Sequence, residues 1–169
     1  MVRLLVVFIH ICAAMGIFGA AAIEGASLFQ LHHPGARQSA LDGFALARRV
    51  GSISFLLLLL SGMFLTQMVW GWETPWIRVS MLSLLVMIGI GATVNRRAMA
   101  RLLASPDAPG GDVVLTRSFL LRAAILIGIV FLMTVKPPLQ ESLIAMAAAV
   151  GAGWLAGVPS GRRRAAQTV

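Results

Sequence analysis

The stretch FIHICAAMGIFGAAAIEG, residues Phe8–Gly25, is almost wholly apolar, yet it contains His10 and Glu24. A helix of about 20 apolar residues crosses the roughly 30 Å hydrocarbon core of a bilayer. The rest of the chain has the same character, because 59% of its residues are hydrophobic and only 12% are charged. Soluble domains carry about 25% charged residues. We therefore expect this stretch to be a membrane-spanning helix with two titratable groups inside it.

Five apolar runs of spanning length follow one another along the chain: residues 4–28, 51–70, 77–94, 118–135 and 139–158. All seven prolines lie between or after these runs, as expected for residues that interrupt helices. The runs must be helical, because an open strand would leave backbone groups unpaired in lipid. The sequence predicts an all-α, polytopic membrane helix bundle with five transmembrane helices. It forms one domain, residues 1–159, followed by a basic cytoplasmic tail, residues 160–169.

The basic residues predict the orientation of the bundle. One face receives eleven arginines and the other only Arg3, Arg78 and Lys136. Because cytoplasmic loops are enriched in Lys and Arg, the N-terminus is expected outside and the C-terminus in the cytoplasm. A cleaved signal peptide at the N-terminus would reverse this distribution, and the first apolar run is longer than the usual 7–15 residues of such a peptide. We expect the first span to be retained, and a four-span arrangement ranks second.

His10 and Glu24 fall on one face of the first helix, about 21 Å apart along its axis. Ionisable residues in a span usually face the bundle interior and mark functional sites. His10 is a candidate ligand of a cofactor or a metal. Glu24 is a candidate proton-handling group, or a partner of Arg48 or Arg49 near the cytoplasmic interface.

Two cofactors suit His10. Copper(I) would favour His10 with Cys12 and Met15, but these point about 160° and 140° away from His10 on a helix, so other spans would have to contribute ligands. Haem would need His10 as an axial ligand. The other histidines, His32 and His33, lie in the linker expected to be cytoplasmic, so one chain does not offer a bis-His haem site.

Lys136 and Glu141 flank the expected outer turn next to Pro137. They are predicted to form an interfacial salt bridge that fixes the hairpin. The alternative is an outer-mouth site shared with Glu73 and Arg78.

Small residues indicate where helices approach closely. Ser54 and Ser61 share a face of the second span, and Gly16 with Ala20 and Gly153 with Gly157 have small-xxx-small spacing. We expect these contacts within the chain rather than across a dimer.

The sequence lacks the motifs of several functional classes. The sequence contains no G-x-S-x-G, H-E-x-x-H, P-loop or C-x-x-C pattern, which argues against a recognisable catalytic site. The arginines lie between apolar runs and form no basic face interleaved with aromatics, which argues against a nucleic-acid partner. The lipid bilayer is the expected partner, with a homo-oligomer or a larger membrane complex as further options.

The segment RRVGSISFLLLLLSGMFLTQMVWGWETPWIRVSMLSLLVMIGIGATVNRR, residues 48–97, resembles the copper-resistance D-like group of small bacterial integral membrane proteins. The shared features are a basic pair before an apolar span, Ser61-Gly62 in mid-span, a Trp- and Gly-rich outer turn, and Asn95-Arg96 at the end of the next span. The resemblance implies a multi-pass protein of the bacterial inner membrane, with a role in copper uptake or tolerance. A distant branch of the group is linked to haem-pathway oxidation, and His10 carries over as the ligand candidate.

These observations predict an integral inner-membrane protein, not an enzyme, that takes part in copper or haem handling or is a partner of a larger membrane complex. One alternative is a membrane oxidoreductase that holds haem through His10. Another is a small transporter, whose polar path would depend on His10, Glu24 and a few serines.

Overall fold

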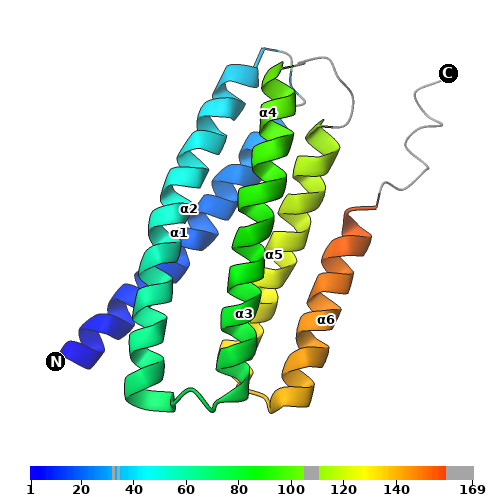
Figure 1. Ribbon diagram of the computed structural model, residues 1–169. Coiled ribbons are helices and arrows are strands. Elements are labelled where there is room, and N and C mark those ends of the chain that lie inside the picture. The colour runs from blue at the N-terminus through cyan, green and yellow to red at the C-terminus, as the bar shows by residue number, and fades with distance from the viewer. Residues whose placement is uncertain (32, 34, 105–110, 159–169) are drawn as a thin grey trace. The chain divides into compact units, whose positions relative to one another are not determined.

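The computed structural model describes residues 1–31, 33, 35–104 and 111–158, and this part of the chain is helical with no strand. The elements are α1 (Val2–Gln30), α2 (Arg37–Leu65), η1 (Thr66–Trp70), α3 (Pro75–Ile90), η2 (Gly91–Asn95), α4 (Arg96–Ala104), α5 (Gly111–Val135) and α6 (Leu139–Ala156) (Figure 1). η1 and η2 are π-helical turns that continue α2 and α3.

Five helices are long and apolar enough to cross a membrane, which confirms the predicted all-α fold with five spanning helices: Val2–Gln30, Arg37–Trp70, Pro75–Ala104, Gly111–Val135 and Leu139–Ala156. Which side of the membrane each end faces stays a prediction. The proposed basic tail, residues 160–169, lies outside the described residues.

Several helices extend well beyond the apolar runs that predicted them. α2 begins at Arg37, although its apolar run begins at Gly51, and the third helix continues through α4 to Ala104. The added segments are rich in Ala, Leu and Arg, which are good helix formers, and most of their charged side chains are exposed. A helix does not have to end where its apolar run ends, so an apolar run gives the length of a span but not the ends of its helix.

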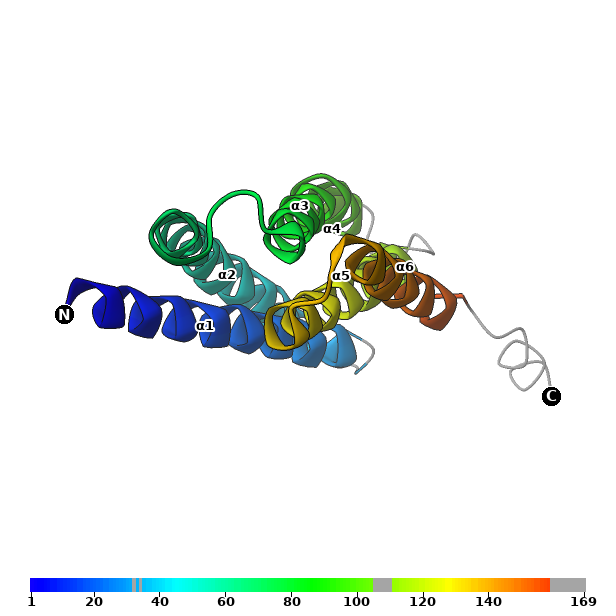
Figure 2. The ribbon, with the colours of Figure 1, turned by 90° about the horizontal axis from the view of Figure 1, so that it is seen from below.

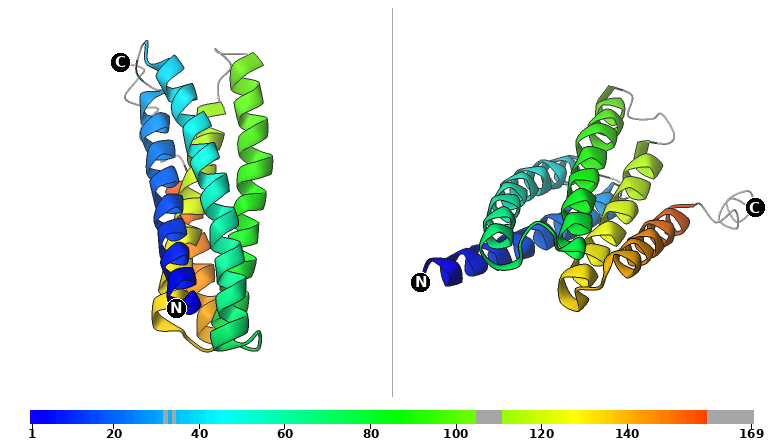
Figure 3. Two further views of the ribbon diagram at one scale, coloured as in Figure 1. Left: turned by 90° about the vertical axis from the view of Figure 1, so that its left-hand side faces the viewer. Right: turned by 60° about the horizontal axis from the view of Figure 1, so that its bottom comes forward.

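The chain divides into two compact units, Met1–Leu82 and Ser83–Val169. In the first unit, α1 and α2 form an antiparallel hairpin, and their ribbons lie side by side in both further views (Figures 2 and 3). Most buried positions on both helices follow the three-four spacing of a heptad, as in left-handed coiled coils. The buried residues are Ala13, Ile17, Ala20, Glu24, Ser27 and Leu28 on α1, and Ala40, Phe44, Ala47, Ser54, Leu58 and Ser61 on α2.

Glycines let α1 and α2 approach closely. A Cβ atom on Gly16 would collide with Ser54 Oγ, and one on Gly43 would collide with Ser27 Oγ. Contacts of this kind are typical of membrane helices, whose association depends on close packing because lipid is as apolar as the side chains. The prediction that Gly16 packs within the chain is confirmed.

The second unit contains the antiparallel hairpin of α5 and α6. A Cβ atom on Gly153 would lie 2.8 Å from Ala124 Cβ and 3.0 Å from Leu121 Cα, so α6 lies almost against the backbone of α5. Gly157 lies beside Arg117, whose Nε donates a hydrogen bond to the Gly157 carbonyl over 2.9 Å. The predicted close contact at Gly153 and Gly157 is therefore also made within the chain.

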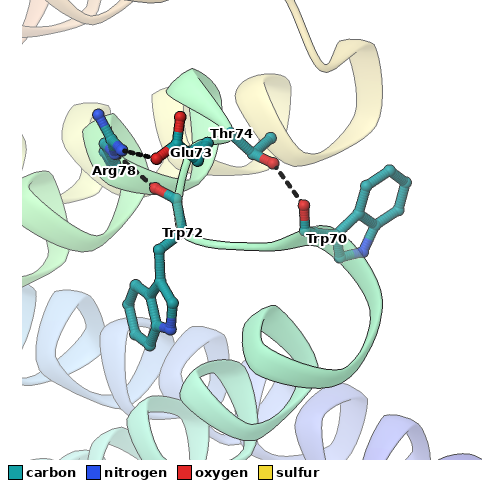
Figure 4. Close-up of polar contacts among 5 residues, drawn as sticks. All are labelled: Trp70, Trp72, Glu73, Thr74 and Arg78. Atoms are coloured by element: carbon teal, nitrogen blue, oxygen red, sulfur yellow. Dashed lines mark hydrogen bonds and ion pairs between the residues drawn. The ribbon is translucent and has the colours of Figure 1, made fainter.

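The turn between α2 and α3 is rich in tryptophan, as the sequence indicated. The rings of Trp70 and Trp76 meet edge to face, with their centroids 5.5 Å apart. Arg78 Nε donates a hydrogen bond to the Trp72 carbonyl, and the Arg78 guanidinium lies 4.0 Å from the Glu73 carboxylate (Figure 4). Arg78 therefore ties the turn to the start of α3, although an ion pair this exposed adds little stability.

Candidate ligand site at His10

His10 lies half-buried on α1 and faces α2. Its Nδ1 atom is 3.0 Å from Ser61 Oγ. A Cβ atom on the next residue, Gly62, would lie 3.2 Å from His10 Cε1, so the ring packs close to the backbone of α2. The heptad spacing of the hairpin brings His10 and Ser61 together, and Gly62 leaves room for the ring.

The hydrogen bonds of Ser61 determine which nitrogen of His10 carries the proton. Ser61 Oγ donates to the Leu57 carbonyl over 2.6 Å, with the Leu58 carbonyl 3.2 Å away. A hydroxyl has a single hydrogen, so towards His10 it can only accept. When Ser61 gives its hydrogen to the Leu57 carbonyl, His10 is the donor and gives its Nδ1 hydrogen to Ser61.

In this tautomer, Nε2 of His10 is the candidate ligand atom. A neutral imidazole carries one N–H, and when Nδ1 holds it, Nε2 keeps a lone pair. Histidines that bind metals usually donate their other N–H to an oxygen, which fixes the tautomer and the ring orientation. Ser61 supplies that oxygen here.

The soft donors near His10 in the sequence are not on its side of the helix. Cys12 and Met15 are both exposed, whereas His10 faces α2. Among the described residues, no group of three or more His, Cys, Asp or Glu side chains comes together as a metal site. The prediction that α1 alone cannot gather a copper(I) site is in agreement with this geometry.

The donor set fits a haem better than a copper ion. Haem iron takes its equatorial ligands from the macrocycle and needs only an axial ligand from a helix, which Nε2 of His10 can supply. Apolar side chains next to the site in sequence are exposed on both helices, namely Phe8 and Ile11 on α1 and Met63 and Phe64 on α2. A porphyrin face requires apolar surface of this kind.

His33 lies just beyond the far end of α1. The His33 ring contacts the Phe29 ring, with centroids 4.7 Å apart, and its Nδ1 lies 3.2 Å from the Phe29 carbonyl. His32 lies outside the described residues. His33 thus has a local role at the end of the helix.

Glu24 is buried in the seam between α1 and α2, with 9% of its surface exposed. The contacts of Gly43 with Ser27 and of Gly51 with Ala20 place it level with Ala47 of α2. The sequence correctly placed Glu24 on the inward face of α1. Its pairing with Arg48 or Arg49 and its role in proton handling stay predictions.

Lys136 and Glu141 flank the turn between α5 and α6. Lys136 adopts a positive φ of 55°, and Glu141 is exposed in the first turn of α6, where a negative charge favours the helix dipole. The salt bridge between them and the outer-mouth site stay predictions.

Sequence reasoning missed the role of Ser61 and Gly62 as neighbours of His10. It placed Ser54 and Ser61 on one face of the second span without aligning that face with α1. The signal was present in the short connection between the helices. Counting outward in both directions from Gly35 brings Ser27 opposite Gly43 and Gly16 opposite Ser54, and it brings His10 to within one residue of Ser61.

When the chain is compared with protein families, curated proteins and solved structures, no match is found.

Proposed function

We propose that this multi-pass membrane protein binds haem through Nε2 of His10 and serves haem or copper handling in a bacterial inner membrane. The observation that carries the proposal is the hydrogen bond from His10 Nδ1 to Ser61 Oγ. With Ser61 as the acceptor, this bond holds the tautomer that a ligand histidine needs and orients the ring against α2.

We rank haem before copper because copper(I) needs more ligand atoms from the protein than haem iron does. Copper(I) would need further soft ligands from other helices, since Cys12 and Met15 lie on other faces of α1. The resemblance to the copper-resistance D-like group supports a metal-linked role and the inner-membrane location. When bound, haem would supply one-electron redox chemistry, and the protein supplies the ligand and the apolar surface.

The proposal is tested by titrating the purified full-length protein in detergent with hemin and recording the absorption spectrum. We expect one equivalent to give a Soret band that differs from that of free hemin. His10→Ala should abolish it, and His33→Ala, the matched control at the other end of α1, should keep it.

A parallel sample is loaded with copper(I), passed through a desalting column and analysed for retained metal. Retention that depends on His10 and a spectrum without a bound-haem band would assign the site to copper instead. The ligand role of His10 is refuted if His10→Ala binds hemin and copper as well as the unaltered protein does.

A further inference from the structure

Arg122 places a positive charge next to the long apolar stretch of helix α5 in the second unit. Its side chain lies along η2, because a Cβ atom on Gly91 would be 3.7 Å from Arg122 Cδ and 3.6 Å from one of its terminal nitrogens. Charged residues inside membrane helices are costly and usually mark a binding site or a pathway. π-helical turns such as η2 are also frequent at functional sites.

The helix formed by η2 and α4 runs antiparallel to α5 in a constant register. At one end, a Cβ atom on Gly111 would lie 3.0 Å from Leu102 Cγ, and at the other end Gly91 meets Arg122. Between these two contacts, stepping equally along both helices brings Asn95 level with Ser118. Asn95, Ser118 and Arg122 therefore lie on the seam between η2 and α5.

Ser118 is the member of this cluster that points to a missing ligand. Only 5% of its surface is exposed, and its buried Oγ has no hydrogen-bond partner within the described ranges of the chain. Buried hydroxyls are rarely left unbonded in folded proteins. Asn95 and Arg122 each have interactions of their own in the structure.

The cluster lies towards one end of the apolar stretch of α5. Ser118 precedes Val135, the last residue of α5, by about 25 Å along the helix axis, and the hydrocarbon core is about 30 Å thick. Four exposed arginines belong to the same end of this unit: Arg96, Arg97, Arg101 and Arg117. Asp112 is the only acidic residue described between Ser83 and Arg122, so an anion is attracted here.

We propose that Arg122, Asn95 and Ser118 form a binding site for a phosphate group, such as the headgroup of an anionic phospholipid. A guanidinium offers five N–H donors in a planar fork that matches phosphate oxygens. The Asn95 amide and the Ser118 hydroxyl add neutral donors. The phosphate would complete the hydrogen bonding of Ser118 and neutralise the charge of Arg122 within the membrane.

The test uses the purified full-length protein and native mass spectrometry with added phosphatidylglycerol, and phosphatidylcholine as the neutral comparison. We expect one phosphatidylglycerol to be retained in preference to phosphatidylcholine. Arg122→Gln should weaken its binding about tenfold, since a charge-assisted hydrogen bond is lost, and Ser118→Ala about threefold. Arg101→Gln, which removes an exposed arginine on α4 away from the seam, should change it less than about twofold.

A second arm measures the binding of inorganic phosphate by ³¹P NMR. Phosphate binding that depends on Arg122, without a preference for phosphatidylglycerol, supports the site and assigns it to a soluble phosphate. The proposal is overturned if neither ligand responds to Arg122→Gln, or if Arg101→Gln weakens binding as much as Arg122→Gln does. If Arg122→Gln loses its helical circular dichroism, Ser118→Ala and Arg122→Lys decide, and unchanged binding in Ser118→Ala rejects the site.

Discussion

The seam between α1 and α2 carries polar side chains along its whole length, whereas the seam between α5 and α6 carries them at its ends. Ser27, Ser54 and Ser61 are buried in the first seam, and Glu24 joins them. In the second hairpin, Arg117 binds the Gly157 carbonyl at one end. At the other end, Ser142 Oγ donates to the Pro137 carbonyl over 3.1 Å.

Glycine brings the helices together in both hairpins, so close packing does not require the polar side chains of the first. Hydrogen bonds between membrane helices contribute only about 0.6 kcal/mol on average. The polar groups of the first seam thus add little to its stability. One of them, Ser61, contacts His10, so the first hairpin differs from the second in holding a candidate ligand histidine against its partner helix.

The largest loss of stability against unfolding is expected when a methyl group is added to the seam between α5 and α6. Gly153→Ala would place its Cβ 2.8 Å from Ala124 and 3.0 Å from the backbone of Leu121, which cannot move aside easily. Overpacking of this kind costs about 1–3 kcal/mol. Reversible unfolding in mixed micelles followed by circular dichroism measures the loss.

Gly151→Ala in the same helix is the matched control, because its Cβ would have no neighbour within 4 Å. It should leave stability unchanged or raise it by about 0.5–1 kcal/mol, since alanine is the better helix former. Equal losses in Gly151→Ala and Gly153→Ala would show that α6 does not pack on α5 through Gly153.

A smaller loss, about 1 kcal/mol, is expected for Gly16→Ala in the polar seam, because the colliding atom is the Ser54 hydroxyl, which can rotate. Adding Ser54→Ala should recover more than half of the loss. Gly19→Ala, whose Cβ meets nothing within 4 Å, is the control and should not destabilise the protein. Recovery by Ser54→Ala of none of the loss would contradict the contact.

The hydrogen bond between His10 and Ser61 should give a coupling of about 0.6 kcal/mol in a double-mutant cycle of His10→Ala and Ser61→Ala. The two side chains touch, so their effects on unfolding should not add. Strictly additive effects would mean that the bond is not formed in the folded protein.

The smallest loss of stability against unfolding is expected for Arg117→Gln, at one end of the seam between α5 and α6. The bond from Arg117 Nε to the Gly157 carbonyl is exposed, and a cation at a helix C-terminus contributes about 0.3–1 kcal/mol at low salt. The loss should shrink as salt is added to the same unfolding experiment. A loss that is independent of salt would point to packing of the Arg117 stem instead.

The sequence predicted the spans well, because apolar length is fixed by the bilayer and proline marks the connections. It also predicted the inward faces of Glu24, Ser54 and Ser61 from helical spacing. It could not give the helix ends at Arg37 and Ala104, because charged residues on an exposed helix look the same as those of a loop. The contact of His10 with Ser61 depends on the register between two helices, and the π-helical turn beside Arg122 has no signal in residue spacing.

The most direct test of this account is the tautomer of His10, read by ¹⁵N NMR on histidine-labelled protein without added ligand. His10→Ala assigns the signal among the three histidines. We expect His10 to carry its proton on Nδ1 with Nε2 unprotonated, and Ser61→Ala to weaken that preference. A proton found on Nε2 would contradict the account, because the ring would then have no lone pair free for haem.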